Sequence, residues 1–313
     1  MSSPMVVGDR MQHAVFLYDD PARFLAGVGR WVAEGLAADE AVVIVAGGAA
    51  HEAIRGSLGV DGDAVAFADM EVIGANPARV IGAVRRFVES GGGRRVRALG
   101  LPMWPGRTPA QQREVIAHEA AVNLAFADSP ISFLCAYDTS ALPAAVVTEA
   151  RRVHPQVWTA DGYADCPQYD MEGLLIGQHP PARPDPLTEP LGVIVDLAGL
   201  AVLRVSVAEI AEDAGLSAQR RDELVVAVNE VATNALAHTA HPAFVSRGLD
   251  RAEGSLVVEV ATHGCIADPL VGRELRPSAL GGRGLWIVNQ LCDLVETRSG
   301  PWGSLTRLHI HLL

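Results

Sequence analysis

The stretch RDELVVAVNEVATNALAHT, residues 221–239, decides the fold of the second half of the chain. Its apolar residues recur at helical spacing and predict one core-facing side, made of Leu224, Val228, Val231 and Ala235. A carboxylate, an amide and an imidazole follow at intervals of four, which stacks them as a second stripe: Glu230, Asn234 and His238. These side chains suit a metal–phosphate site, although a solvated helix face would show the same spacing.

A glycine-rich segment lies downstream, SALGGRGLWIVNQLCD at 278–293. Gly281, Gly282 and Gly284 precede an apolar run, and we expect a helix over 282–294. Backbone amides at a glycine-rich helix N-terminus can approach phosphate, and the helix dipole favours the anion. Taken alone, the same residues fit a turn followed by a core helix.

Together these segments resemble the GHKL ATPase superfamily, and within it the anti-sigma-factor serine kinases of bacteria. The motifs that carry the resemblance are NEVATNALAH at 229–238, GGRGLWIV at 281–288 and GSLTRLHI at 303–310. The resemblance covers about 190–313 and implies a two-layer α/β sandwich with an ATP site of the HATPase_c type. The short gap from Gly264 to Gly281 is more similar to anti-sigma kinases than to histidine kinases, which stay as a weaker alternative.

The same resemblance implies a role for each matching residue. Asn234 would ligate Mg²⁺, and Glu230 would be the catalytic base or orient a water. ATP would be held by the remaining matched positions, which are His238, Thr262, Gly264, Gly282, Gly284, Leu285 and Thr306. A family kinase phosphorylates a serine of an anti-anti-sigma factor and also binds a sigma factor directly.

The first glycine box departs from the family pattern of Asp-x-Gly-x-Gly. In VVEVATHGCIADP, residues 257–269, Thr262 replaces the aspartate and Ile266 replaces the second glycine. A neutral hydroxyl accepts a weaker hydrogen bond from adenine than a carboxylate does, which predicts a loss of about tenfold to a few tens of fold in affinity. Two hypotheses follow: a serine/threonine kinase with a weakened ATP site, or a partner-switching module without catalysis.

The segment QHPPARPDPLTEP at 178–190 holds five prolines and predicts a semi-rigid linker. We therefore expect a first domain at 1–178, a linker at 179–190 and a second domain at 191–313. Apolar runs alternate with helical patterns in the first domain, which predicts a mostly parallel sheet flanked by helices. No phosphate-loop motif occurs there.

The first domain resembles the MEDS sensory domain, named for methanogens, methylotrophs and a dichloromethane-responsive regulator. The resemblance rests on four short motifs: HAVFLYDD at 13–20, HEAAVN at 118–123, LCAYD at 134–138 and HP at 154–155. It implies a RecA-like sheet and the sensing of a small, hydrocarbon-derived ligand. Ligands of open parallel sheets bind beyond the carboxyl ends of strands, and the candidate residues are His13, Tyr18, Asp19, His118, Glu119, Cys135, Tyr137 and Asp138. A metal site is not favoured because the spacing of these residues is not compact.

The formal net charge of −12 gives no general attraction for nucleic acid or for an anionic membrane. The four cysteines form no C-x-x-C pair, and neither a leader nor an apolar span is evident. The sequence therefore predicts a cytoplasmic bacterial regulator of transcription, with a sensor domain first and an anti-sigma-type domain second. It leaves open whether the protein forms a homodimer.

Overall fold

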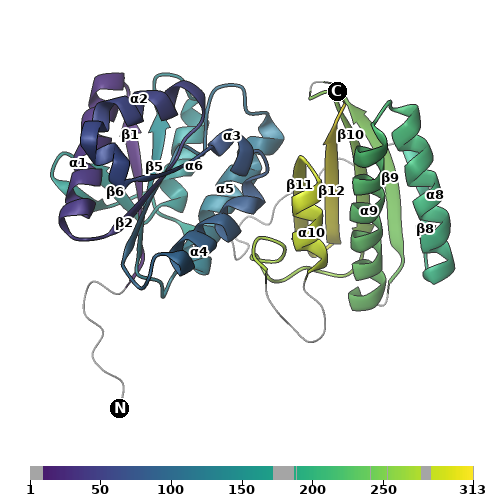
Figure 1. Ribbon diagram of the computed structural model, residues 1–313. Coiled ribbons are helices and arrows are strands. Elements are labelled where there is room, and N and C mark those ends of the chain that lie inside the picture. The colour runs from purple at the N-terminus through teal and green to yellow at the C-terminus, as the bar shows by residue number, and fades with distance from the viewer. Residues whose placement is uncertain are drawn as a thin grey trace, which may run out of the picture. The chain divides into compact units, whose positions relative to one another are not determined.

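The computed structural model describes residues 10–171, 187, 189–239, 241–251, 253–275 and 283–312. The chain divides into two compact units, residues 1–175 and 176–313, and each is described by itself (Figure 1). Within the described ranges, every helix is too short or too polar to cross a membrane. The predicted linker lies largely outside these ranges, and its last two residues, Glu189 and Pro190, already belong to a strand.

The first unit is built on a seven-stranded sheet with the order β3-β2-β4-β5-β1-β6-β7. All neighbouring pairs are parallel except β6 and β7, as the alternating sequence pattern predicts. The strands are β1 (Gln12–Tyr18), β2 (Ala41–Val45), β3 (Ala66–Ala68), β4 (Val96–Gly100), β5 (Ile131–Asp138), β6 (Gln156–Thr159) and β7 (Gly162–Asp165). Most side chains of the central strands are apolar and buried, as expected where helices cover both faces of a sheet.

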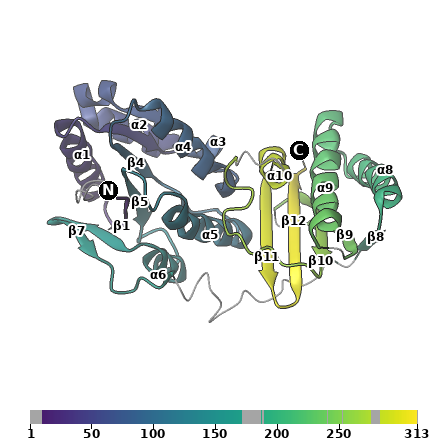
Figure 2. The same ribbon diagram turned by 90° about the horizontal axis from the view of Figure 1, so that it is seen from below.

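Alternation along the strands decides which helices each face of this sheet meets (Figure 2). Phe16 of β1 packs in one core with α1, whereas Val15 packs on the other side with α5 and α6. The first face carries α1 (Pro21–Ala37) and α2 (Gly48–Leu58). The helices that follow are α3 (Met70–Ile73), α4 (Val80–Ser90), α5 (Pro109–Ala125) and α6 (Ala144–Val153), with 3₁₀ turns at Gly59–Ala64 and Pro77–Arg79.

Helix α5 carries two of the candidate residues, His118 and Glu119, and local sequence specifies where this helix begins. Pro109 occupies the first turn, where its missing N–H has no helical partner to lose. Thr108 and Gln111 form a reciprocal capping box, since each side chain bonds the other residue's backbone N–H. These contacts fix the register of the helix and therefore the direction in which Glu119 points.

The second unit is a five-stranded antiparallel sheet with the order β11-β12-β10-β9-β8. Three helices lie in the described part of this unit and share one core with the sheet, so they cover a single face and form the predicted two-layer sandwich. The strands are β8 (Glu189–Ile194), β9 (Ala243–Asp250), β10 (Ser255–Thr262), β11 (Leu294–Gly300) and β12 (Gly303–His311). The helices are α8 (Leu197–Asp213), α9 (Ala218–Thr239) and α10 (Gly284–Leu291).

The helix expected over 282–294 is shorter in the structure, because α10 ends at Leu291 and β11 begins at Leu294. β11 has no simple alternation of apolar and polar residues. Its Glu296 is buried and lies 3.2 Å from His309 of β12 and 3.3 Å from Arg298. Cross-strand pairing makes this strand stable where its own composition does not indicate one.

Candidate functional site

The second unit contains a pocket of about 260 Å³ between α9, α10, β10 and β12. Seven of the predicted nucleotide-binding residues line it together: Asn234, His238, Thr262, Gly264, Gly284, Leu285 and Thr306. Gly282 lies outside the described residues. Segments that are up to 72 residues apart in the sequence thus meet at one cavity, because the antiparallel sheet places the end of β10 beside β12 and below α9.

Gly284 marks the end of the pocket where α10 begins. A Cβ at this position would lie 2.6 Å from Asn234 Nδ2 and 3.0 Å from Glu230 Oε2, so the bare glycine allows both side chains to approach the helix N-terminus. The side chains of Glu230 and Asn234 form no hydrogen bond or ion pair with another described residue. A carboxylate and an amide without a side-chain partner among the described residues therefore lie near a helix N-terminus, where the helix dipole favours anions.

Thr262 marks the other end of the pocket, at the last position of β10. Thr262 is 9% exposed and pairs in register with Ser304 of β12. Ile266 also lines the pocket, and its backbone N–H donates to Ser299 Oγ at 2.9 Å, which holds the loop in place. Asp268 accepts the N–H of Leu270 within its own turn and is not in the lining. Among the described residues, no acidic side chain lines this pocket.

The first unit contains a buried polar cluster formed by His13, Glu119, Cys135 and His154, whose residues are 0–6% exposed. Glu119 Oε2 lies 3.1 Å from His13 Nε2 and 3.3 Å from His154 Nε2, and it accepts a hydrogen bond from Cys135 Sγ at 3.2 Å. Cys135 Sγ lies 3.5 Å from His13 Nε2. The cluster thus receives one polar side chain from each of four elements: β1, α5, β5 and the end of α6.

The outer nitrogen of each histidine contacts an acceptor. His13 Nδ1 lies 3.0 Å from Asn123 Oδ1, and His154 Nδ1 lies 2.6 Å from the Ala150 carbonyl oxygen. Asn123 Nδ2 in turn donates to the Val153 carbonyl at 2.8 Å. Both imidazole rings are therefore held with Nε2 toward the centre of the cluster.

Burial sets the direction of the pKa shifts of Cys135 and His13 in this cluster, but not that of Glu119. It raises the pKa of the Cys135 thiol well above its usual value, and the Glu119 carboxylate adds to the rise. Burial lowers the pKa of His13, and His154 lowers it further. Burial also raises the pKa of Glu119, but the hydrogen bonds and charges of His13 and His154 together outweigh burial and lower this pKa well below its usual value.

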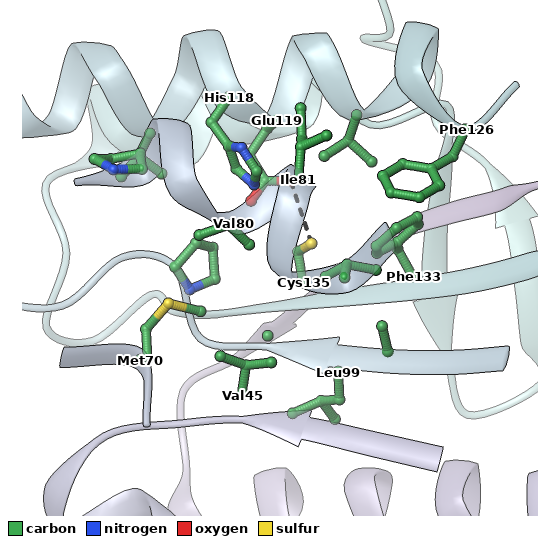
Figure 3. A pocket seen from close by; sticks show the side chains of 17 residues that line it. Val45, Met70, Val80, Ile81, Leu99, His118, Glu119, Phe126, Phe133 and Cys135 are labelled. Carbon is green, nitrogen blue, oxygen red and sulfur yellow. Dashed lines mark hydrogen bonds between the residues drawn. The ribbon is translucent and has the colours of Figure 1, made fainter. Parts of the chain in front are cut away.

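An apolar cavity of about 40 Å³ adjoins this cluster (Figure 3). His118 and Glu119 reach it from α5 and Cys135 from β5, while Met70 and Leu99 line its far side. The cavity is large enough for only a few non-hydrogen atoms. The lining of the cavity is apolar except for the side formed by His118, Glu119 and Cys135.

The other sensory candidates lie at the carboxyl edge of the sheet or beside the cluster. Tyr18 is half-buried, and burial followed by the charge of Asp138 raises its pKa to about 12. Asp19 is exposed and pairs with Arg23, and Asp138 accepts the N–H of Ser140 at 2.9 Å. The structure does not bring these three residues into the cluster.

Tyr137 lies on the same face of β5 as Cys135 and is fully buried, with its ring centroid 6.0 Å from that of His154. Sequence reasoning did not select His154 or Asn123 as site residues, although both fall in motifs that carry the MEDS resemblance. The first and last members of the cluster, His13 and His154, are 141 positions apart in the sequence, so ligand spacing gave no sign of the cluster.

Comparison with known proteins agrees with both halves of this description. Residues 12–155 match the model of the MEDS family, the MEthanogen/methylotroph, DcmR Sensory domain. Residues 194–310 match the histidine kinase-like ATPase domain. The chain joins a MEDS domain to a histidine kinase-like ATPase domain. Both resemblances expected from the sequence are thereby confirmed at the level of the domain.

One solved structure that is similar in part contains the RsbU and RsbW domains of a Mycobacterium tuberculosis protein. The identity is 19% over 40% of this chain, the TM-score is 0.30, and the chain spans about a third of that structure (33%). None of the curated proteins compared with the chain matches it. The pocket of about 260 Å³ lies in the ATPase domain, and the buried polar cluster lies in the MEDS domain.

Proposed function

We propose that this protein is a signalling regulator whose MEDS domain senses a small ligand and whose ATPase domain acts as an anti-sigma-type protein kinase. The observation that carries the proposal is the pocket that gathers Asn234, Gly284 and Thr306 from three separate segments of the ATPase domain. The expected partners are a sigma factor, an anti-anti-sigma factor, or both. The expected ligand of the MEDS domain is small and apolar, in keeping with the cavity beside Cys135.

The residues at the α10 end of the pocket fit Mg²⁺ and phosphate. Asn234 offers an amide oxygen, which is a ligand type that Mg²⁺ accepts, and its side chain has no described hydrogen-bond partner to give up. Bound Mg·ATP would supply the phosphoryl group for transfer. Glu230 stands 3.0 Å from the position of a Cβ on Gly284, and in that place its carboxylate would orient the attacking hydroxyl and accept its proton.

The Thr262 end of the pocket fits adenine less well. A base-specific contact there would rest on a hydroxyl, because no acidic side chain among the described residues lines the pocket. Ile266 adds bulk at the same end. We therefore propose a nucleotide site that has the residues to bind Mg²⁺ and phosphate but binds adenine weakly.

Thr262→Asp is expected to tighten Mg·ATP binding by about tenfold to a few tens of fold, because a carboxylate makes a stronger hydrogen bond to the adenine amino group. Isothermal titration of the wild-type and variant proteins with Mg·ATP measures this change. Mg·GTP is the matched ligand: guanine presents a carbonyl oxygen where adenine has its amino group, so the variant should bind it no more tightly.

Thr306→Asp is the matched control variant, because Thr306 also lines the pocket and is similarly buried. It places a carboxylate in the same cavity at a point where no contact with the adenine amino group is expected, so ATP affinity should not rise. If neither the wild type nor Thr262→Asp binds Mg·ATP at millimolar concentration, the pocket is not a nucleotide site and the kinase proposal fails.

A binding module without catalysis is the second candidate function, and exposed apolar side chains favour it. Two large ones, Val202 and Val205, lie three positions apart on α8 and therefore share one side of the helix. Exposed apolar residues gathered in one region are typical of protein-interaction surfaces. Such a surface would bind a sigma factor or its antagonist whether or not the pocket holds ATP.

Phosphoryl transfer separates the two candidates. With γ-labelled ATP and an anti-anti-sigma protein of the source organism, a kinase labels a serine of that protein, and both Asn234→Ala and Glu230→Ala abolish the label. A binding module gives no label, keeps its partner in both variants without ATP, and loses it in Val202→Glu. Glu52→Ala, an exposed change in the other domain, is the control and should alter neither result.

A further inference from the structure

The distances in the buried cluster of the MEDS domain are within about 0.2 Å of those between the ligands of a tetrahedral metal ion. Zinc bonds of about 2.0–2.3 Å to nitrogen, oxygen and sulfur imply separations of roughly 3.3–3.7 Å between ligand atoms. The four contacts among Glu119 Oε2, Cys135 Sγ and the two Nε2 atoms measure 3.1–3.5 Å. The ligand atoms of all four residues lie within 4.8 Å of one another.

The hydrogen bonds around the cluster determine which histidine atoms can accept a cation. Asn123 Nδ2 donates to two backbone carbonyls, so Asn123 Oδ1 faces His13 and His13 Nδ1 is the donor. His154 Nδ1 donates to the Ala150 carbonyl oxygen. In neutral imidazoles both Nε2 lone pairs then point toward the Glu119 carboxylate, an arrangement that requires a proton or a cation between them. Metal-binding histidines are oriented in the same way, by an outer N–H bonded to an amide or carbonyl oxygen.

We propose that His13, Glu119, Cys135 and His154 form a site for a divalent transition metal of the zinc type. One thiolate and one carboxylate balance the charge of the ion, and two neutral imidazoles complete a tetrahedral set. Binding releases the thiol proton of Cys135 and the proton that the Nε2 atoms and the Glu119 carboxylate share without metal, so the site forms with loss of two protons. Full burial of the ligands suits a neutral complex of this kind, since an unbalanced charge there would be costly.

The ion would also lie in the wall of the apolar cavity. Glu119 and Cys135 both line that cavity, so two of the metal ligands face it directly (Figure 3). A small ligand with a soft donor atom could reach the coordination shell from inside the cavity. Metal and ligand would then be sensed by one site rather than two.

Metal loading of the full-length protein tests the proposal. The protein is stripped with a chelator, loaded with Zn²⁺ or Co²⁺ and freed of excess metal, and its metal content is measured by mass spectrometry. About one ion per chain is expected. The Co²⁺ form should show a thiolate-to-cobalt charge-transfer band together with the visible bands of a tetrahedral ion.

Cys135→Ser should remove the charge-transfer band, and His154→Ala should lower the Zn²⁺ affinity by at least about tenfold. Cys166→Ser is the matched control, because Cys166 is a buried free cysteine of the same unit whose thiol donates to the Arg151 carbonyl instead. It should leave the band and the metal content unchanged. Circular dichroism confirms that each variant is folded.

Any one of three outcomes would overturn the proposal. The first is that the wild-type protein retains less than about a tenth of an ion per chain after loading. The second is that the charge-transfer band survives in Cys135→Ser, and the third is that the band disappears in Cys166→Ser. In the first case the cluster is held together by a proton rather than a metal.

Discussion

Gly303→Ala is expected to lower the free energy of unfolding of the ATPase domain by more than about 3 kcal/mol. Gly303 has φ of +113°, and a Cβ there would lie 2.1 Å from the Thr262 carbonyl oxygen and 2.9 Å from the His263 Cα. Both obstacles are main chain, so relief requires β10 and β12 to separate at the edge of the pocket. Hydrogen exchange resolved by peptide measures the loss in β10 and β12 independently of the MEDS domain.

Gly254→Ala is the matched control for this prediction. Gly254 also has a positive φ, +59°, but a Cβ there would meet no atom within 4 Å. Its replacement should cost about 1 kcal/mol, from backbone strain alone. Equal losses in the two variants would show that contact with the Thr262 main chain contributes nothing.

Glu119→Ala is expected to destabilise the MEDS domain by about 3–5 kcal/mol in the presence of a chelator. The Glu119 carboxylate is the shared partner of three buried groups, His13, Cys135 and His154. Its removal leaves them without that partner and opens a cavity in α5. Hydrogen exchange in β1 and β5 is the measurement, because both strands carry a member of the cluster.

Glu119→Gln separates the loss of charge from the loss of the side chain. It keeps an oxygen to accept from the Cys135 thiol and gains an N–H that can donate to one Nε2, so it should cost less than Glu119→Ala. Glu52→Ala, an exposed substitution on α2, should change stability by no more than about 0.5 kcal/mol. A Glu119→Ala effect as small as that of Glu52→Ala would contradict a structural role for the cluster.

Much of the fold could be predicted because the chain has strong local patterns. The buried strand at 41–45 is an unbroken apolar run, and the helix at 218–239 shows its core face at helical spacing. β9 and β11 were not predicted, because their stability comes from neighbouring strands. Buried hydrogen-bonded pairs such as Glu296 with His309 place polar residues where a strand pattern would have apolar ones.

The two sites differed in how far the sequence indicated them. The pocket residues fall in compact motifs, since a single helix turn sets the spacing of Glu230, Asn234 and His238. The buried cluster is assembled by parallel strands whose pairing joins residues far apart, as with His13 and Phe133 in register. No local spacing encodes such a contact, which is why His154 and the metal-like geometry emerged only from the three-dimensional structure.

Cys265 gives the ATPase pocket an accessible thiol for chemical labelling, which the other cysteines of the chain do not offer. It lines the pocket and is exposed, whereas the other three cysteines, Cys135, Cys166 and Cys292, are buried. A thiol-reactive fluorophore would therefore attach at the rim of this pocket alone. Protection of that thiol by a nucleotide would report occupancy on the unmodified sequence, without a radiolabel and without knowledge of the protein partner.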